Sequence, residues 1–215
     1  MKQVFFSIMT LTGVVICANL TRFILGNLLT PVPSISFTAL ILMPITLTLF
    51  SCVIDKKIVK NGKRTGKAIS RLHYVSLATM VLLIIYYQYR ICKELNLTND
   101  VNQLFINNDM ASSLLSVVVI VFIGPLAEER FFRGTLWNLL AEIPKTMQSS
   151  ITCIFFILFH IPNGRFGVIV VIFPAILFTL ARSISASIIS SMVLHILFNA
   201  VRVFLVIQVW LSLGH

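Results

Sequence analysis

The stretch SSLLSVVVIVFIGPLAEERFFRG, Ser112–Gly134, contains no charged residue before Glu128 and then four ionisable side chains within six positions. A helix needs about 20 apolar residues to cross the hydrocarbon core of a membrane, and this stretch supplies most of them. Ionisable groups inside a membrane helix are costly unless they are paired or hydrated, so they are functional candidates by default. The stretch therefore predicts a membrane helix with a polar, function-bearing centre.

The composition of the whole chain places it among membrane proteins. Of its 215 residues, 58% are apolar and only 11% are charged, and the mean hydropathy is +0.97. The net charge is +10, but the basic residues lie mainly between apolar runs. Membrane topology and anionic lipid headgroups explain them better than nucleic acid does. The four cysteines lie in or beside apolar runs without CxxC spacing, and we interpret them as small apolar residues.

Apolar runs predict an all-α polytopic membrane protein with about seven transmembrane helices. We divide it into an N-terminal three-span region, residues 1–111, and a catalytic helical core in the last four spans, residues 112–215. The N-terminal run is interpreted as a first span because no cleavage site for a signal peptide follows it. The expected spans are Val4–Leu25, Ser36–Ile54, Leu72–Cys92, Ser112–Leu140, Ser149–Pro162, Phe166–Ala181 and Ala186–Leu213.

The lysines and arginines predict the orientation of these spans. The segment Asp55–Arg71 holds seven basic residues and one acid, and the positive-inside rule makes it cytoplasmic. Alternating spans then place the N-terminus, the loop Ala141–Gln148 and a turn at Arg182 on the cytoplasmic side. Ten basic residues fall on that side and four on the other, with three inside spans. A docking surface for an acidic substrate is the less favoured interpretation of the basic segment.

Polar residues on three of the predicted spans lie at comparable depths. At a rise of about 1.5 Å per residue, Glu128 lies about 20 Å from the loop that begins at Ala141. His160 lies about 18 Å from the other end of that loop, and His195 about 14 Å from the start of its span. The three helices therefore deliver a carboxylate and two imidazoles to one level of the membrane.

Spacing divides the roles of these residues. Glu129 and Arg133 are separated by four positions with the acid first, which favours an ion pair on one helix face. Glu128 points about 100° away from Glu129, so the two need not share a role. His195 and Asn199 also share a face, as do Phe156 and His160. Arg130 receives no role, and a lone intramembrane histidine such as His160 is, by itself, more often a hydrogen-bonded packing residue.

The set of side chains suits hydrolysis. Glu128 can act as a general base on a water molecule, and His160 can position that water. His195 and Asn199 can donate hydrogen bonds to a developing oxyanion. A zinc ion held by Glu128, His160 and His195 is a second option, because zinc takes such ligands and keeps a position for water. The HExxH motif and the GxSxG elbow are both absent from the sequence.

The three motifs also resemble those of a known family. EERFFR at Glu128–Arg133 is similar to an EExxxR motif, FILFH at Phe156–His160 to FxxxH, and HILFN at His195–Asn199 to HxxxN. In this order and on separate spans, they resemble the CAAX-protease and bacteriocin-processing family of intramembrane endopeptidases, and the resemblance covers about half the chain. It implies that Glu128 activates the hydrolytic water with support from Glu129 and Arg133. It also implies second-motif and third-motif roles for His160 and for His195 with Asn199, by either a metal-dependent or a glutamate-type mechanism.

The resemblance further implies cleavage of a membrane-associated peptide or protein near the cytoplasmic face. The compact chain favours a bacterial member, and therefore a small peptide or bacteriocin leader over a prenylated GTPase as substrate. Two alternatives belong to other classes. The first is a bacteriocin self-immunity protein that retains the motifs without obligatory proteolysis. The second is a small ion-coupled transporter that uses Glu128 and Glu129 as a relay, although no inverted repeat supports it.

Overall fold

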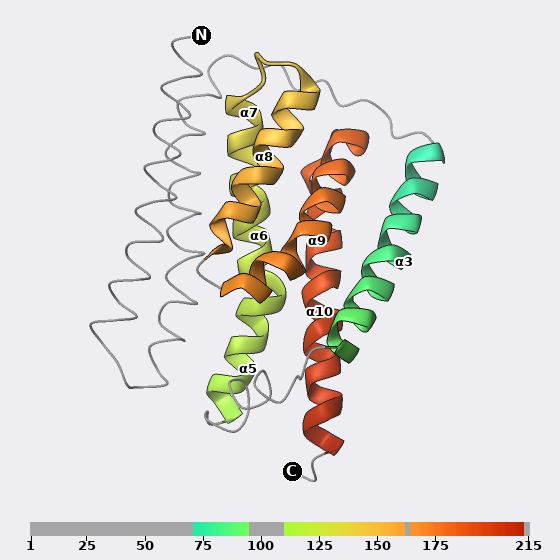
Figure 1. Ribbon diagram of the computed structural model, residues 1–215, viewed down its shortest axis with the longest axis vertical. Coiled ribbons are helices and arrows are strands. Elements are labelled where there is room, and N and C mark those ends of the chain that lie inside the picture. Colours follow the sequence, from blue (N-terminus) through green and yellow to red (C-terminus); the bar gives the residue numbers. More distant parts are fainter. Residues whose placement is uncertain (1–70, 95–109, 162–163, 213–215) are drawn as a thin grey trace, which may run out of the picture.

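The structure is a computed structural model that describes residues 71–94, 110–161 and 164–212 (Figure 1). Within these ranges the chain is helical and contains no strand, which confirms the predicted helical class. The first two predicted spans, Val4–Leu25 and Ser36–Ile54, lie outside the described residues, so the count of seven stays a prediction. The elements are α3 (Arg71–Glu94), α5 (Met110–Val118), η3 (Val119–Ile123), α6 (Gly124–Glu129), η4 (Arg130–Leu136), α7 (Trp137–Leu139), α8 (Lys145–Phe159), α9 (Gly164–Ser185) and α10 (Ile188–Ser212).

The fourth predicted span is one continuous helix of 30 residues, Met110–Leu139. It includes two π-helical segments, η3 and η4, on either side of the short α6. This helix, Val168–Ser185 and Ile188–Ser212 are each long and apolar enough to cross a membrane. The described part of the chain is thus that of a multi-pass integral membrane protein.

Two predicted spans have different bounds in the structure. The fifth was expected at Ser149–Pro162, whereas α8 is Lys145–Phe159 and stops before His160. Its 15 residues measure about 22 Å, too short for a hydrocarbon core of about 30 Å. The sixth was expected at Phe166–Ala181, whereas α9 continues to Ser185. Arg182 therefore lies in the last turn of a helix, and the connection to α10 comes after it.

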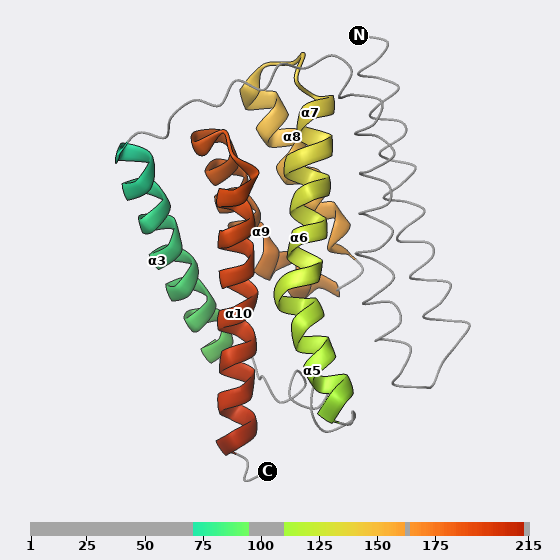
Figure 2. The ribbon, with the colours of Figure 1, turned by 180° about the vertical axis from the view of Figure 1, so that it is seen from behind.

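If consecutive helices cross the membrane in opposite directions, every second connection lies on the same side. The connections that this rule places together lie at one end of the molecule. The start of α3, the α7–α8 connection and the α9–α10 connection all lie at the top of Figure 1. The start of α5 and the end of α10 lie at the opposite end, and the reverse view in Figure 2 agrees. This arrangement is the one expected for antiparallel spans.

Helix α10 contacts α3 on one side and α9 and α6 on others, while α8 packs on α9 and η4 (Figures 1 and 2). Phenylalanines dominate the buried core between α8, α9 and η4, with Phe131, Phe132 and Phe156 almost fully buried. Phe132 contacts Phe156 edge to face, with 5.2 Å between the ring centroids. These aromatic contacts hold η4 against α8, next to the polar residues of both segments.

Tyr87 joins α3 to α9 at a proline. Pro174 lies inside α9 and has no N–H to donate to the carbonyl of Val170, four residues earlier. The hydroxyl of Tyr87 lies 3.3 Å from that carbonyl oxygen and donates to it. The described part of the N-terminal region is in this way attached to the predicted catalytic core.

Candidate active site

The two adjacent glutamates lie at the end of α6, between two π-helical segments. In η3 the N–H of Gly124 bonds to the carbonyl of Val119, five residues earlier. Pro125 follows at the start of α6, where its missing N–H is tolerated. Such π-helical turns often occur at functional sites, because the extra residue rotates the side chains that follow.

Glu129 and Arg133 form the predicted ion pair. Arg133 Nη1 lies 3.0 Å from Glu129 Oε1, and both side chains are fully buried. Arg133 Nη2 also donates to the carbonyl of Ala175 and to the hydroxyl of Thr179, each at 3.2 Å. Its guanidinium carbon lies 4.1 Å from the centre of the Phe156 ring. These contacts compensate the two buried charges, while Glu129 Oε2 and Arg133 Nε make no hydrogen bond among the described residues.

His195 is fixed by Glu129 from the next helix. Its Nδ1 lies 3.0 Å from Glu129 Oε1, the oxygen that also accepts from Arg133. Phe178 stacks on the imidazole with 4.6 Å between ring centroids. An ionised carboxylate only accepts hydrogen bonds, so the proton lies on Nδ1. Nε2 lies on the other edge of the ring, away from Glu129.

His160 is fixed by the end of its own helix. The main-chain N–H of His160 bonds to the carbonyl of Ile157, which leaves the carbonyl of Phe156 without its usual partner. His160 Nδ1 lies 2.8 Å from that carbonyl oxygen and donates to it. The Phe156 ring also packs against the imidazole, at 4.7 Å between centroids, as their spacing predicted. His160 Nε2 is left facing away from the helix end.

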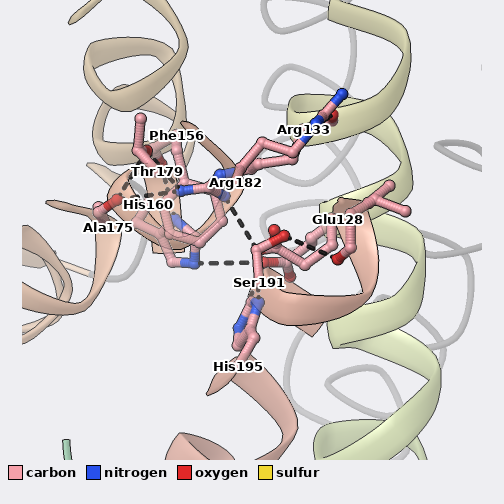
Figure 3. A network of polar contacts seen from close by, with 11 residues as sticks. Glu128, Arg133, Phe156, His160, Ala175, Thr179, Arg182, Ser191 and His195 are labelled. Atoms are coloured by element: carbon pink, nitrogen blue, oxygen red, sulfur yellow. Dashed lines mark hydrogen bonds and ion pairs between the residues drawn. The ribbon is translucent and has the colours of Figure 1, made fainter. Parts of the chain in front are cut away.

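Glu128 receives both imidazoles at one carboxylate oxygen. Its Oε2 lies 3.8 Å from His160 Nε2 and 3.9 Å from His195 Nε2. Figure 3 shows Glu128, His160 and His195 converging from three helices. Among the described residues, none makes a hydrogen bond to this buried oxygen. The side chains of Glu128 and His160 are each 12% exposed, whereas that of Glu129 is fully buried. Of these three residues, only Glu128 and His160 are accessible.

Asn199 does not point its amide nitrogen at the Glu128 oxygen. Its Nδ2 donates to the carbonyl of Ile120 in η3, at 2.8 Å. Arg130, which received no role from the sequence, is exposed, whereas Glu129 and Arg133 are buried. The predicted use of Asn199 as an oxyanion donor stays a prediction.

Three residues near the site were missed by the sequence analysis. Thr179 and Phe178 on α9 contact Arg133 and His195, and Arg182 Nε donates to the carbonyl of Arg133 at 2.9 Å. Arg182 also lies over the Trp137 ring, 5.2 Å from its centre. These residues belong to no short motif, and the one available signal was Arg182, a charge at the end of an apolar run.

The predicted zinc ligands meet, but as they stand they do not form a metal site. Within the residues that the structure describes, no group of three or more His, Cys, Asp or Glu side chains is arranged to hold a metal ion. Both histidines donate a hydrogen bond through Nδ1, so that Nε2 faces Glu128. This orientation of Nε2 suits the binding of water as well as that of a metal. We derive no step through a metal, and the zinc hypothesis stays a prediction to be tested.

The helices and the buried carboxylate–imidazole cluster define a multi-pass membrane protein with a hydrolytic set of side chains inside its helical core. Residues 110–201 match the sequence model of the family described as type II CAAX prenyl endopeptidase, Rce1-like. This part of the chain is therefore similar to a family of membrane proteases, in agreement with the resemblance of its three motifs. Comparisons with curated proteins and with solved structures found no match.

Proposed function

We propose that the protein is an intramembrane endopeptidase in which Glu128 activates water to hydrolyse a peptide bond of a membrane-associated peptide or protein. The observation that carries this proposal is the convergence of two imidazole Nε2 atoms on one buried oxygen of Glu128, at 3.8 and 3.9 Å. These distances are too long for direct hydrogen bonds, but a water about 2.8 Å from each group can bridge them.

The hydrogen-bond pattern assigns a role to each group. Glu128 Oε2 takes a proton from the water as its oxygen attacks the carbonyl carbon, and His160 Nε2 accepts the second hydrogen to orient it. An Nε2–H of His195 would donate to the developing oxyanion, and Glu129 holds the ring in place for this through Nδ1. The C–N bond then breaks, and Glu128 returns its proton to the leaving nitrogen.

Arg133 and Glu129 support this chemistry without touching the water. Arg133 fixes Glu129, and Glu129 fixes the ring and the Nδ1 proton of His195. This is the chain of support that carboxylate–histidine pairs supply in other hydrolases. We expect the peptide to approach from the cytoplasmic side, at the end of the bundle where α3 begins after the basic segment Asp55–Arg71.

The proposal is tested with the full chain in lipid vesicles. The probes are a farnesylated peptide ending in a CAAX sequence and an unmodified leader peptide, with products identified by mass spectrometry. We expect the wild type to cleave one of them, and Glu128→Gln and His160→Ala to abolish cleavage. Glu142→Gln, in the exposed α7–α8 connection, is the matched control and keeps activity. Undiminished cleavage by both site variants would falsify the proposal.

The two alternatives give different results in the same set of variants. A self-immunity protein without proteolysis would protect cells from a bacteriocin equally well with Glu128→Gln. An ion-coupled transporter would show proton or solute flux across the vesicle membrane that Glu128→Gln removes. The match to a membrane protease family favours the endopeptidase over both.

A further inference from the structure

The carbonyl of Ile120 lacks its usual main-chain donor for two reasons, one in the structure and one in the sequence. In a regular α-helix it would accept from the N–H of Gly124, but that N–H bonds to Val119 instead. In the same five-residue pattern, the carbonyl of Ile120 would accept a hydrogen bond from the N–H of position 125. Position 125 is a proline, which has no N–H. A buried carbonyl without a donor destabilises the helix at this point.

Asn199 supplies the missing donor from α10. Its Nδ2 lies 2.8 Å from the Ile120 oxygen, the geometry of a good hydrogen bond. Asn199 is half-buried, Pro125 is buried, and α10 packs on both η3 and α6. Replacement of Asn199 by an apolar residue therefore leaves the carbonyl unsatisfied, while replacement of Pro125 by alanine supplies a new N–H.

Asn199 and His195 contact η3 and the end of α6 from one face of α10. His195 bonds to Glu129, the last residue of α6. Asn199, one turn further along α10, bonds to Ile120 in η3, four residues before α6 begins. Two contacts from one rigid helix fix both the rotation and the height of the short segment between them. Glu128 lies within that segment, with its Oε2 facing both imidazoles.

We propose that Asn199 is a positioning residue, which holds the Glu128 turn in register by replacing the N–H that Pro125 lacks. This inference rests on the proposed function for its effect on catalysis. It differs from the oxyanion hypothesis in one measurable respect: a positioning role can be taken over by a main-chain N–H at position 125.

The test is a double-variant cycle on the full chain, with cleavage rate and unfolding temperature measured on the same preparations. Asn199→Leu removes the donor at similar size, and we expect cleavage to fall about tenfold to a hundredfold, the effect of a small displacement of a catalytic group. Pro125→Ala alone stays close to wild type, because alanine is also accepted in the first turn of a helix. Pro125→Ala combined with Asn199→Leu is expected to recover most of the lost rate and the lost unfolding temperature.

The outcomes separate the hypotheses. A double variant as inactive as Asn199→Leu alone shows that the amide contacts the reacting carbonyl, and overturns the proposal. Full activity of Asn199→Leu also overturns it. If the wild type cleaves neither peptide, it is the proposed function that fails. In that case a restored unfolding temperature in the double variant still supports the link between Asn199, Ile120 and Pro125, and an unrestored one overturns it.

Discussion

Glu128 and Glu129 are neighbours in the chain, yet their surroundings differ in kind. Glu129 is fully buried and accepts from Arg133 and His195 through one oxygen. Glu128 is slightly exposed, and its Oε2 has no hydrogen-bond partner among the described residues. A carboxylate that is fully buried in an ion pair with Arg133 supports the fold, whereas a partly exposed one that faces two imidazoles is available for chemistry.

This difference predicts opposite effects of one substitution at adjacent positions. Glu128→Gln should abolish cleavage and leave the unfolding temperature nearly unchanged, because no hydrogen bond is lost. Glu129→Gln should lower stability by about 3–5 kcal/mol, because the charge of Arg133 is left buried and uncompensated. Thermal unfolding in detergent measures both variants. Equal unfolding temperatures for the two would contradict the assignment.

Arg133 should not tolerate lysine. The guanidinium reaches Glu129, Ala175 and Thr179 at once through two nitrogens and lies over the Phe156 ring. A lysine keeps the charge but loses the planar fork, so we expect a loss of about 1–3 kcal/mol in stability. Thr179→Val removes only one of these contacts and is the matched control, with a loss of about 1 kcal/mol. A lysine variant as stable as wild type would show that charge alone matters here.

Metal removal separates the two mechanisms that the sequence leaves open. Glu128 acting as a general base needs no metal, so we expect cleavage to persist after treatment with a chelator and dialysis into metal-free buffer. Elemental analysis of the same preparation gives the metal content per chain. Loss of cleavage that zinc restores would overturn the metal-free chemistry proposed for Glu128.

At the scale of helices, carbonyl groups released by irregularities explain much of the structure. The end of α8 frees the carbonyl of Phe156, which His160 takes. The π-helical turn and Pro125 leave the carbonyl of Ile120 without a main-chain donor, and Asn199 donates to it. Pro174 frees that of Val170, which Tyr87 takes. Because a backbone acceptor within a membrane must be satisfied by protein, each irregularity recruits a side chain from its own or a neighbouring helix.

These links mark what could be predicted from the sequence and what could not. The Glu129–Arg133 pair followed from a four-residue spacing, and the meeting of Glu128, His160 and His195 followed from helix depth. The contacts of Asn199 and Arg182 did not follow, because they depend on which carbonyl is released and which helix lies beside it. The early end of α8 was also missed, since its apolar pattern continues through Ile161 to Pro162.

Two glycines in the site helix should respond differently to alanine. A Cβ at Gly124 would lie 3.2 Å from the carbonyl oxygen of Val119, a main-chain atom that cannot move without changing the π-turn. A Cβ at Gly134 would lie 3.2 Å from the end of the Ile188 side chain, which can rotate away. We expect Gly124→Ala to reduce cleavage about tenfold or more through displacement of Glu128. Gly134→Ala should be neutral or slightly stabilising, since alanine is favoured by about 1 kcal/mol in helices.

Cleavage assays and thermal unfolding of the two alanine variants decide this comparison. Gly134→Ala serves as the control because it adds the same methyl group to the same helix. If both variants keep full activity, the π-turn is not needed to position Glu128, and the proposal for Asn199 is weakened with it.

At the scale of the whole molecule, the described connections fall into two groups at opposite ends of the helices. The α7–α8 and α9–α10 connections and the start of α3 share one end (Figure 1). Arg71, the last residue of the basic segment Asp55–Arg71, begins α3 at this end, and Lys145 begins α8 there. From the positive-inside rule we expect this end to be cytoplasmic. Arg182 adds less to this argument than the sequence suggested, because it is half-buried and bonds to the carbonyl of Arg133.

The orientation predicts which introduced cysteines react from each side of the membrane. Ala141→Cys lies in the exposed α7–α8 connection, and Ser212→Cys is exposed at the last residue of α10, at the opposite end. With a membrane-impermeant maleimide, Ala141→Cys should be labelled in inverted vesicles and Ser212→Cys in right-side-out vesicles. The wild type, with its own four cysteines, gives the background, and labelling after detergent gives the maximum for each variant. The reverse pattern would place the α7–α8 connection outside, contradict the positive-inside assignment, and move the expected approach of the peptide to the other face.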